Sequence, residues 1–115
     1  MKFLIVDDNE MMRKTLIRFI KAEEDEILEC GDGKTAVELF MEHHPDWVLM
    51  DIRMKETSGI EATTRIRECD PHANVIIVTD YGDRFFRSAA ERAGAVGFIT
   101  KENLSEINSI VRRAK

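Results

Sequence analysis

Acidic residues follow two apolar segments of the chain directly, and this placement is the first sign of chemistry. An apolar segment near the N-terminus runs into Asp7 and Asp8, and a second one near the middle of the chain runs into Asp51. A hydroxyl and an amine follow two later apolar segments, at Thr79 and at Lys101. If these residues met in space, the site would combine three carboxylates with one hydroxyl and one ammonium group.

Three clustered carboxylates repel one another, so their proximity requires a cation. A pair about 4 Å apart costs on the order of 4 kcal/mol at an effective dielectric constant near 20. Oxygen ligands without His or Cys select a hard ion, and few direct carboxylates with water and phosphate suit Mg²⁺. Asp7, Asp8 and Asp51 are therefore candidate ligands of Mg²⁺. With Lys101 and Thr79 as donors, the set favours phosphoryl transfer onto Asp51 as an aspartyl phosphate.

The elements that must position these residues can be read from apolar periodicity. Five short apolar segments recur, and several are apolar on consecutive residues, as strands buried on both faces of a parallel sheet require. These predicted strands are 3–6, 27–30, 47–50, 75–78 and 96–99. Apolar residues at helical spacing lie between and after them: Met12, Leu16, Phe19 and Ile20; Ala36, Leu39 and Phe40; Ala62, Ile66 and Cys69; Leu104, Ile107, Ile110 and Val111.

Strict alternation of strand and helix predicts an α/β fold with a doubly wound, five-stranded parallel sheet and right-handed crossovers. In such a sheet, ligands bind outside the carboxyl ends of the strands, at the point where the strand order reverses. Asp7, Asp51 and Thr79 would then lie together at one edge of the sheet.

Composition narrows the function classes. The 115 residues suit one domain, 1–115, and a net charge of −5 argues against direct binding of nucleic acid. No apolar run approaches the roughly 20 residues that cross a bilayer, so we expect no membrane span and a cytoplasmic protein. Cys30 and Cys69 have no disulfide framework spacing, and we expect both to be small buried residues in a reducing compartment.

Four segments of the chain resemble a known family. They are DD at 7–8, MDIRM at 50–54 followed by SGIEA, VTDYGD at 78–83 and GAVGFITK at 94–101. Together they resemble the receiver domain of response regulators in bacterial two-component systems, including the chemotaxis regulators. The resemblance covers nearly the whole chain and implies the flavodoxin-like (βα)5 fold with strand order 2-1-3-4-5.

The resemblance also implies a role for each matching residue. Asp51 matches the phosphoacceptor, Asp7 and Asp8 match the acidic pair that holds Mg²⁺, and Arg53 would give the metal a backbone carbonyl. Lys101 matches the lysine that pairs with the phosphoryl group. Two further residues match the switch, Thr79 as its hydroxyl and Phe98 as its aromatic side chain.

The resemblance implies partners as well. The phosphoryl donor would be a phosphohistidine on a sensor histidine kinase or a phosphotransfer protein, and the switch would act through the fourth helix, fifth strand and fifth helix. That face could bind a downstream target, an output domain or a second copy of the chain as a dimer. Receivers catalyse only their own phosphorylation and dephosphorylation, so we do not expect a conventional enzyme. Whether this receiver stands alone or belongs to a longer protein is left open.

Three positions depart from the family pattern. Lys55 stands where the family often has proline. Asp80 follows Thr79 where the family usually has alanine or glycine, and Glu102 follows Lys101 where proline is expected. A cis bond costs about 3 kcal/mol without proline, so we predict a trans Lys101–Glu102 peptide with the lysine still reaching the carboxylates.

Two other functions remain possible from the sequence. A Mg²⁺-dependent aspartyl-phosphate phosphatase would use the same chemistry, but it would want an acid/base carboxylate where Arg53 stands. A degenerate receiver that is never phosphorylated would act as a binding module, and Asp80 and Glu102 are the residues that favour it. A stable single phosphoryl adduct would distinguish the receiver from both.

Overall fold

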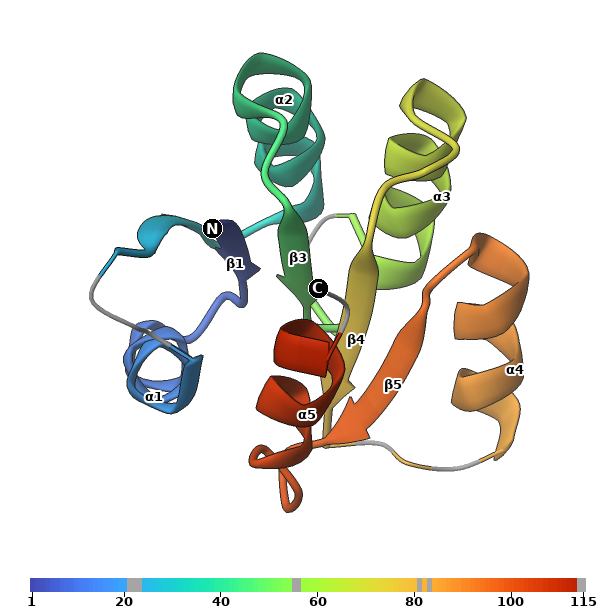
Figure 1. Ribbon diagram of the computed structural model, residues 1–115. Coiled ribbons are helices and arrows are strands. Elements are labelled where there is room, and N and C mark those ends of the chain that lie inside the picture. The colour runs from blue at the N-terminus through green and yellow to red at the C-terminus, as the bar shows by residue number, and fades with distance from the viewer. Residues whose placement is uncertain (21–23, 55–56, 81, 83, 114–115) are drawn as a thin grey trace.

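The computed structural model describes residues 1–20, 24–54, 57–80, 82 and 84–113. Five strands alternate with five helices in the described part of the chain, which confirms the predicted order of elements (Figure 1). None of these helices is long and apolar enough to cross a membrane. The elements are β1 (Lys2–Val6), α1 (Glu10–Ile20), β2 (Glu26–Cys30), α2 (Gly33–His43), β3 (Trp47–Met50), α3 (Gly59–Cys69), β4 (Val75–Thr79), α4 (Arg84–Ala93), β5 (Gly97–Thr100) and α5 (Glu106–Arg113).

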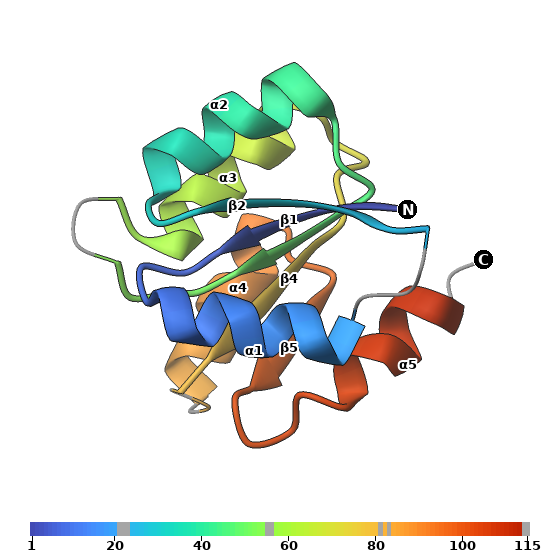
Figure 2. The same cartoon turned by 90° about the vertical axis from the view of Figure 1, so that its left-hand side faces the viewer.

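The strands form one parallel sheet in the order β2-β1-β3-β4-β5, as predicted. The order reverses between β1 and β3, because the chain leaves β1 toward one edge and returns to build the other. Figure 2 shows α2 and α3 on one face of the sheet and α1 and α5 on the opposite face. The helix α4 joins the side of α2 and α3, since Ala90 packs in the same apolar cluster as Ala36 and Ala62.

Alternate residues of each central strand enter different cores, which explains the consecutive apolar residues. In β1, Leu4 and Val6 belong to the core under α2, α3 and α4. Phe3 and Ile5 belong to the core under α1 and α5. Successive side chains of a strand point to opposite faces, so a sheet covered on both faces needs apolar residues at every position.

Side chains cap the helices that flank the site. The carboxylate of Asp32 accepts a hydrogen bond from the Thr35 amide at 2.8 Å and opens α2, and Ser58 accepts one from the Glu61 amide at 3.1 Å and opens α3. After α4, Gly94 adopts a φ of 101°, a backbone conformation that favours glycine and ends the helix. Two capping side chains and one left-handed glycine thus set these helix boundaries.

Three details of the predicted core are wrong. Phe19 is 43% exposed, because the inward stripe of α1 is completed by Leu16 and Ile20. Cys69, at the last position of α3, is also exposed, whereas Cys30 is half-buried and desolvation raises the pKa of its thiol to about 11. Leu104 is buried as predicted, but it lies in the turn before α5, which begins at Glu106.

Candidate functional site

Backbone hydrogen bonds continue the sheet just past the strand ends and fix the residues that follow. The Asp51 amide donates to the Val6 carbonyl at 2.9 Å, and the Asp7 amide donates to the Cys30 carbonyl at 3.2 Å. On the other side, the Lys101 amide donates to the Thr79 carbonyl at 2.9 Å. The ends of β1, β2 and β3 are therefore held in line, as are the ends of β4 and β5, at the edge where the sequence predicted a site.

Asp7, Asp8 and Asp51 meet at this edge and form an acidic cluster. One carboxylate oxygen from each residue lies within 4.8 Å of the others. Asp7 and Asp51 are buried, and Asp8 is exposed. Three oxygen ligands with one open side fit a hard divalent cation that keeps some of its water, so the residues present suit Mg²⁺.

Lys101 brings an ammonium group to the acidic cluster. Its Nζ lies 3.0 Å from Asp7 Oδ2, 3.6 Å from Asp51 Oδ1 and 3.9 Å from Asp80 Oδ2. Desolvation lowers the pKa of Lys101, but the hydrogen bond with Asp7 and the surrounding carboxylates outweigh it, so that the pKa is raised. The lysine is therefore held in its protonated, positively charged form beside Asp51.

The backbone at Lys101 is as predicted. There is no cis peptide bond in the described residues, which include both Lys101 and Glu102. The trans connection still lets the four-carbon stem of Lys101 reach Asp7 and Asp51.

The surroundings of Asp51 change the acidity of its carboxyl group. Desolvation by burial raises the pKa of Asp51 to about 6, and the charges of Asp7 and Asp8 add to the effect while Lys101 opposes it. A carboxylate that is held ionised at neutral pH against this tendency is poorly solvated and available to a positively polarised phosphorus.

The raised pKa of Asp51 predicts a stability difference that depends on pH. In the unfolded chain the group titrates near 3.9, so between about pH 4 and pH 6 the folded protein binds more protons and stability falls as pH rises. Without divalent cations, Asp51→Asn should therefore be more stable than the parent by about 1–3 kcal/mol above pH 7 and by almost nothing below pH 4. Urea unfolding in EDTA at both pH values checks this, and equal stability at neutral pH would contradict the repulsion.

Arg13 is a residue of the site that sequence reasoning missed. Its Nη1 donates to the carbonyl of Asp7 at 2.7 Å, and its Nε forms an ion pair with Glu29 Oε1 at 3.0 Å. The guanidinium thus ties α1 and β2 to the loop that carries the acidic cluster. The spacing of Arg13 from Asp7 in the sequence gave no signal of this contact.

The other predicted site residues lie at different depths. Thr79 is fully buried at the end of β4, next to the lysine through the backbone bond described above. Arg53 is exposed and lies two residues after Asp51, in the β3–α3 loop. Phe98 is not in the acidic cluster but on β5, half-buried against α4.

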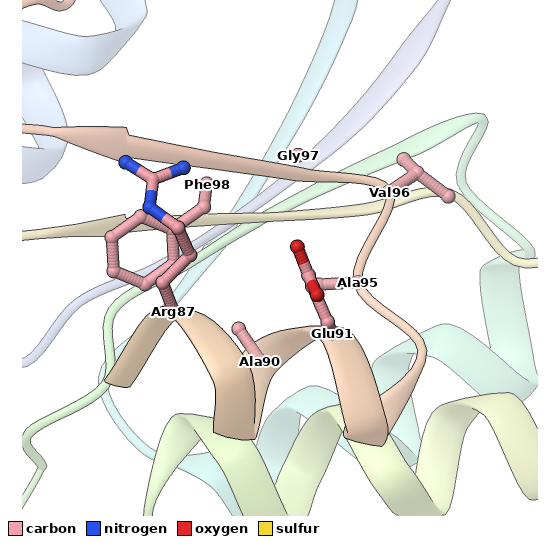
Figure 3. Close-up of a pocket in the computed structure, with 7 residues that line it drawn as sticks. All are labelled: Arg87, Ala90, Glu91, Ala95, Val96, Gly97 and Phe98. Carbon is pink, nitrogen blue, oxygen red and sulfur yellow. The ribbon is translucent and has the colours of Figure 1, made fainter. Parts of the chain in front are cut away.

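A pocket of about 240 Å³ lies between α4 and β5, beside Phe98. Figure 3 shows the Arg87 side chain lying across the Phe98 ring and the Glu91 carboxylate reaching into the pocket. The guanidinium carbon of Arg87 is 4.7 Å from the ring centroid, within the range of a cation–π contact. The pocket therefore opens on the helix and strand that the resemblance to receivers implied as part of a switching face.

Comparisons with known proteins agree with this architecture. The chain is 48% identical over 99 residues to the chemotaxis protein CheY of Halobacterium salinarum, covering 85% of this chain and 82% of that protein. It is 39% identical over 114 residues to the regulatory protein AtoC of Escherichia coli, covering 98% of this chain but only 25% of AtoC. Among solved structures, the CheX–CheY–BeF₃–Mg²⁺ complex of Borrelia burgdorferi gives a TM-score of 0.85 at 30% identity, covering 96% of this chain and 88% of the other.

The family itself is shown by a match along most of the chain. Residues 3–112 match the model of the response regulator receiver domain. Proteins of this kind act in two-component signalling, interact with histidine kinases and output domains, and are not classical enzymes. With the five-stranded sheet, the acidic cluster and the lysine in their expected places, the chain belongs to the response regulator receiver domain family.

Proposed function

We propose that this receiver accepts a phosphoryl group on Asp51 from a phosphohistidine of a sensor histidine kinase or phosphotransfer protein. The observation that carries the proposal is the meeting of the Asp51 carboxylate with Asp7, Asp8 and the Lys101 ammonium at the carboxyl edge of the sheet. This is the combination of a nucleophilic oxygen and positive charge that phosphoryl transfer requires.

Asp51, Lys101 and Thr79 would have different roles in the transfer. A carboxylate oxygen of Asp51 forms the new bond to phosphorus while the bond from phosphorus to the donor nitrogen breaks, and the electron pair of that bond stays on the nitrogen. The Lys101 ammonium stabilises charge on the phosphoryl oxygens, and it is already within 3.6 Å of the acceptor carboxylate. Thr79 would offer its hydroxyl to the phosphoryl group once it is attached.

Asp7, Asp8 and Asp51, with the backbone carbonyl of Arg53, would hold Mg²⁺. When bound, the ion would offset the repulsion among the carboxylates and polarise the phosphoryl oxygens. The fit of the oxygen ligands supports this assignment, and so does the complex from Borrelia burgdorferi, in which a similar CheY chain occurs together with Mg²⁺ and BeF₃.

Acetyl phosphate with Mg²⁺ and intact-mass measurement tests the proposal directly. The parent protein should gain one phosphoryl group that survives long enough to be weighed. No adduct would favour the degenerate receiver that acts as a binding module, whereas steady release of phosphate without an adduct would favour the phosphatase. A stable single adduct on Asp51 is the result that we expect.

Binding of Mg²⁺ should raise the melting temperature of the unphosphorylated protein. The ion would bind the folded acidic cluster but not the unfolded chain, so an excess of about a hundred times its dissociation constant adds about 2.7 kcal/mol. Asp8→Ala should abolish the response, measured by thermal unfolding with and without millimolar Mg²⁺.

Glu10→Ala is the matched control, because it removes a nearby exposed carboxylate that lies outside the acidic cluster. This variant should keep the response to Mg²⁺. A parent protein indifferent to Mg²⁺, or equal responses in the two variants, would count against the three-carboxylate site.

Phosphorylation would be transmitted to the face formed by α4, β5 and α5. Thr79 ends β4, Phe98 lies on the neighbouring strand, and the pocket between α4 and β5 opens beside the Phe98 ring (Figure 3). A change at Thr79 would therefore alter the packing of Phe98 and the shape of the pocket. A downstream target, an output domain or a second copy of the chain would bind this face.

A further inference from the structure

Asp80 is a fourth carboxylate at the site, and the function proposed above does not use it. Its Oδ2 lies 3.9 Å from the Nζ of Lys101, on the same ammonium that contacts Asp7 and Asp51. The side chain of Asp80 is 69% exposed, whereas those of Asp7 and Asp51 are 2% and 9% exposed. Lys101 therefore has two buried carboxylates on its inner side and Asp80 on its solvent side.

The sheet order explains why Asp80 lies there. The strand β4 lies between β3, which leads to Asp51, and β5, which leads to Lys101. Asp80 directly follows the last residue of β4, so its backbone stands at the rim between the strand ends that lead to Asp51 and to Lys101. A donor that approached Asp51 from the solvent side of Lys101 would meet the charge of Asp80.

The negative charge that Asp80 presents to a donor depends on whether Lys101 is paired with it. If Lys101 turns to the phosphoryl oxygens, as the proposed function requires, it leaves Asp80 without the cation described beside it. The carboxylate then faces the donor as a net negative charge. The effect of Asp80 should depend on the charge of the leaving group, because the carboxylate attracts a positively charged leaving group and repels a negatively charged one.

We propose that Asp80 is a specificity-determining residue that favours phosphoramidate donors over acyl phosphates. The inference rests on the proposed phosphorylation of Asp51 and names the donor class of that site. A phosphoramidate presents a nitrogen that carries protons and positive charge, and this nitrogen can donate a hydrogen bond to Asp80. An acyl phosphate presents a carboxylate leaving group, which Asp80 repels.

The two transfers differ in the charge of the group that leaves phosphorus. With a protonated phosphoramidate, the phosphorus–nitrogen bond breaks, its electron pair stays on nitrogen, and a neutral amine or imidazole leaves. With acetyl phosphate, the phosphorus–oxygen bond breaks, its electron pair stays on oxygen, and an acetate anion leaves. In both cases the new bond joins phosphorus to an Asp51 oxygen. Only the second transfer builds negative charge beside Asp80.

The test compares two donors on the parent protein and on Asp80→Asn, following the phosphorylated fraction by intact mass with Mg²⁺ present. The ratio of the rate with phosphoramidate to the rate with acetyl phosphate should fall about fivefold in Asp80→Asn, since one exposed charge acts in opposite senses on the donors. Asp80→Glu should keep a ratio near that of the parent. Glu102→Gln, which removes an exposed charge next to Lys101 in the chain, should also leave the ratio unchanged.

Each result decides between explanations. A ratio unchanged in Asp80→Asn, even with both rates altered, would overturn the inference, because a general effect on the site moves both donors together. Loss of the melting response to Mg²⁺ in Asp80→Asn would also overturn it, since Asp80 would then act through the metal. A parent protein that takes phosphoryl groups from neither donor would instead overturn the proposed function itself.

Discussion

Asp51→Asn should abolish phosphoryl uptake while leaving the fold intact. The amide keeps the shape of the carboxylate but is not a nucleophile, so the loss should be at least about a thousandfold. The backbone of residue 51 should keep its place, because its amide donates to the Val6 carbonyl of the neighbouring strand. Intact mass after incubation with acetyl phosphate and Mg²⁺ measures the uptake, and circular dichroism checks the fold.

Asp46→Asn is the matched control for this experiment. Asp46 is an exposed aspartate at the opposite end of β3, where it accepts a hydrogen bond from the Lys2 amide. The same chemical change at that end should leave uptake unchanged. Uptake by Asp51→Asn at the parental rate would show that another residue accepts the phosphoryl group.

The fold could be predicted because the apolar pattern of the strands indicates that they are buried on both faces. Residues 3–6 and 75–78 are apolar at every position, and a strand of this kind needs cover on both faces. Once strand and helix alternate, the handedness of crossovers leaves few arrangements, and the resemblance to receivers selected one of them. The structure confirms that order.

The meeting of the site residues could be predicted for a related reason. Asp7, Asp51 and Thr79 each stand directly after a strand or at its end, and parallel strands bring equivalent ends to one edge. Lys101 follows the last strand in the same way. The sequence thus indicated that the side chains of Asp7, Asp51 and Lys101 meet, although the role of each in phosphorylation remains a prediction.

Other features depend on details that periodicity does not contain. Phe19 lies at the border of the inward stripe of α1, where a small rotation of the helix decides between core and solvent. The contact of Arg87 with Phe98 depends on how α4 lies against β5. The ion pair between Asp80 and Lys101 depends on the rotamers of two long-range partners, so the sequence showed an unusual residue but not its contact.

Gly59→Ala should cause the largest loss of stability of any single methyl group added near the site. A Cβ atom at position 59 would lie 1.8 Å from the carbonyl oxygen of Asp51 and 2.8 Å from its carbonyl carbon. Both atoms are backbone, so no side chain can turn away to make room. The loop cannot easily retreat either, because the Gly59 amide donates to the Ile52 carbonyl at 2.8 Å.

The same overlap should also displace the phosphoacceptor, so function and stability should fall together. We expect Gly59→Ala to lose roughly 3 kcal/mol or more in urea unfolding and to lose most phosphoryl uptake, even where it remains folded. Gly31→Ala is the control, since its added Cβ would meet Arg13 and Asp8 at an ordinary 3.7 Å, and it should stay within about 1 kcal/mol of the parent. Parental stability in Gly59→Ala would mean that the β3–α3 loop can move away from Asp51. The close approach of α3 to Asp51 would then not matter for the position of the acceptor. A loss of stability and uptake in Gly59→Ala but not in Gly31→Ala would show that Gly59 sets this position.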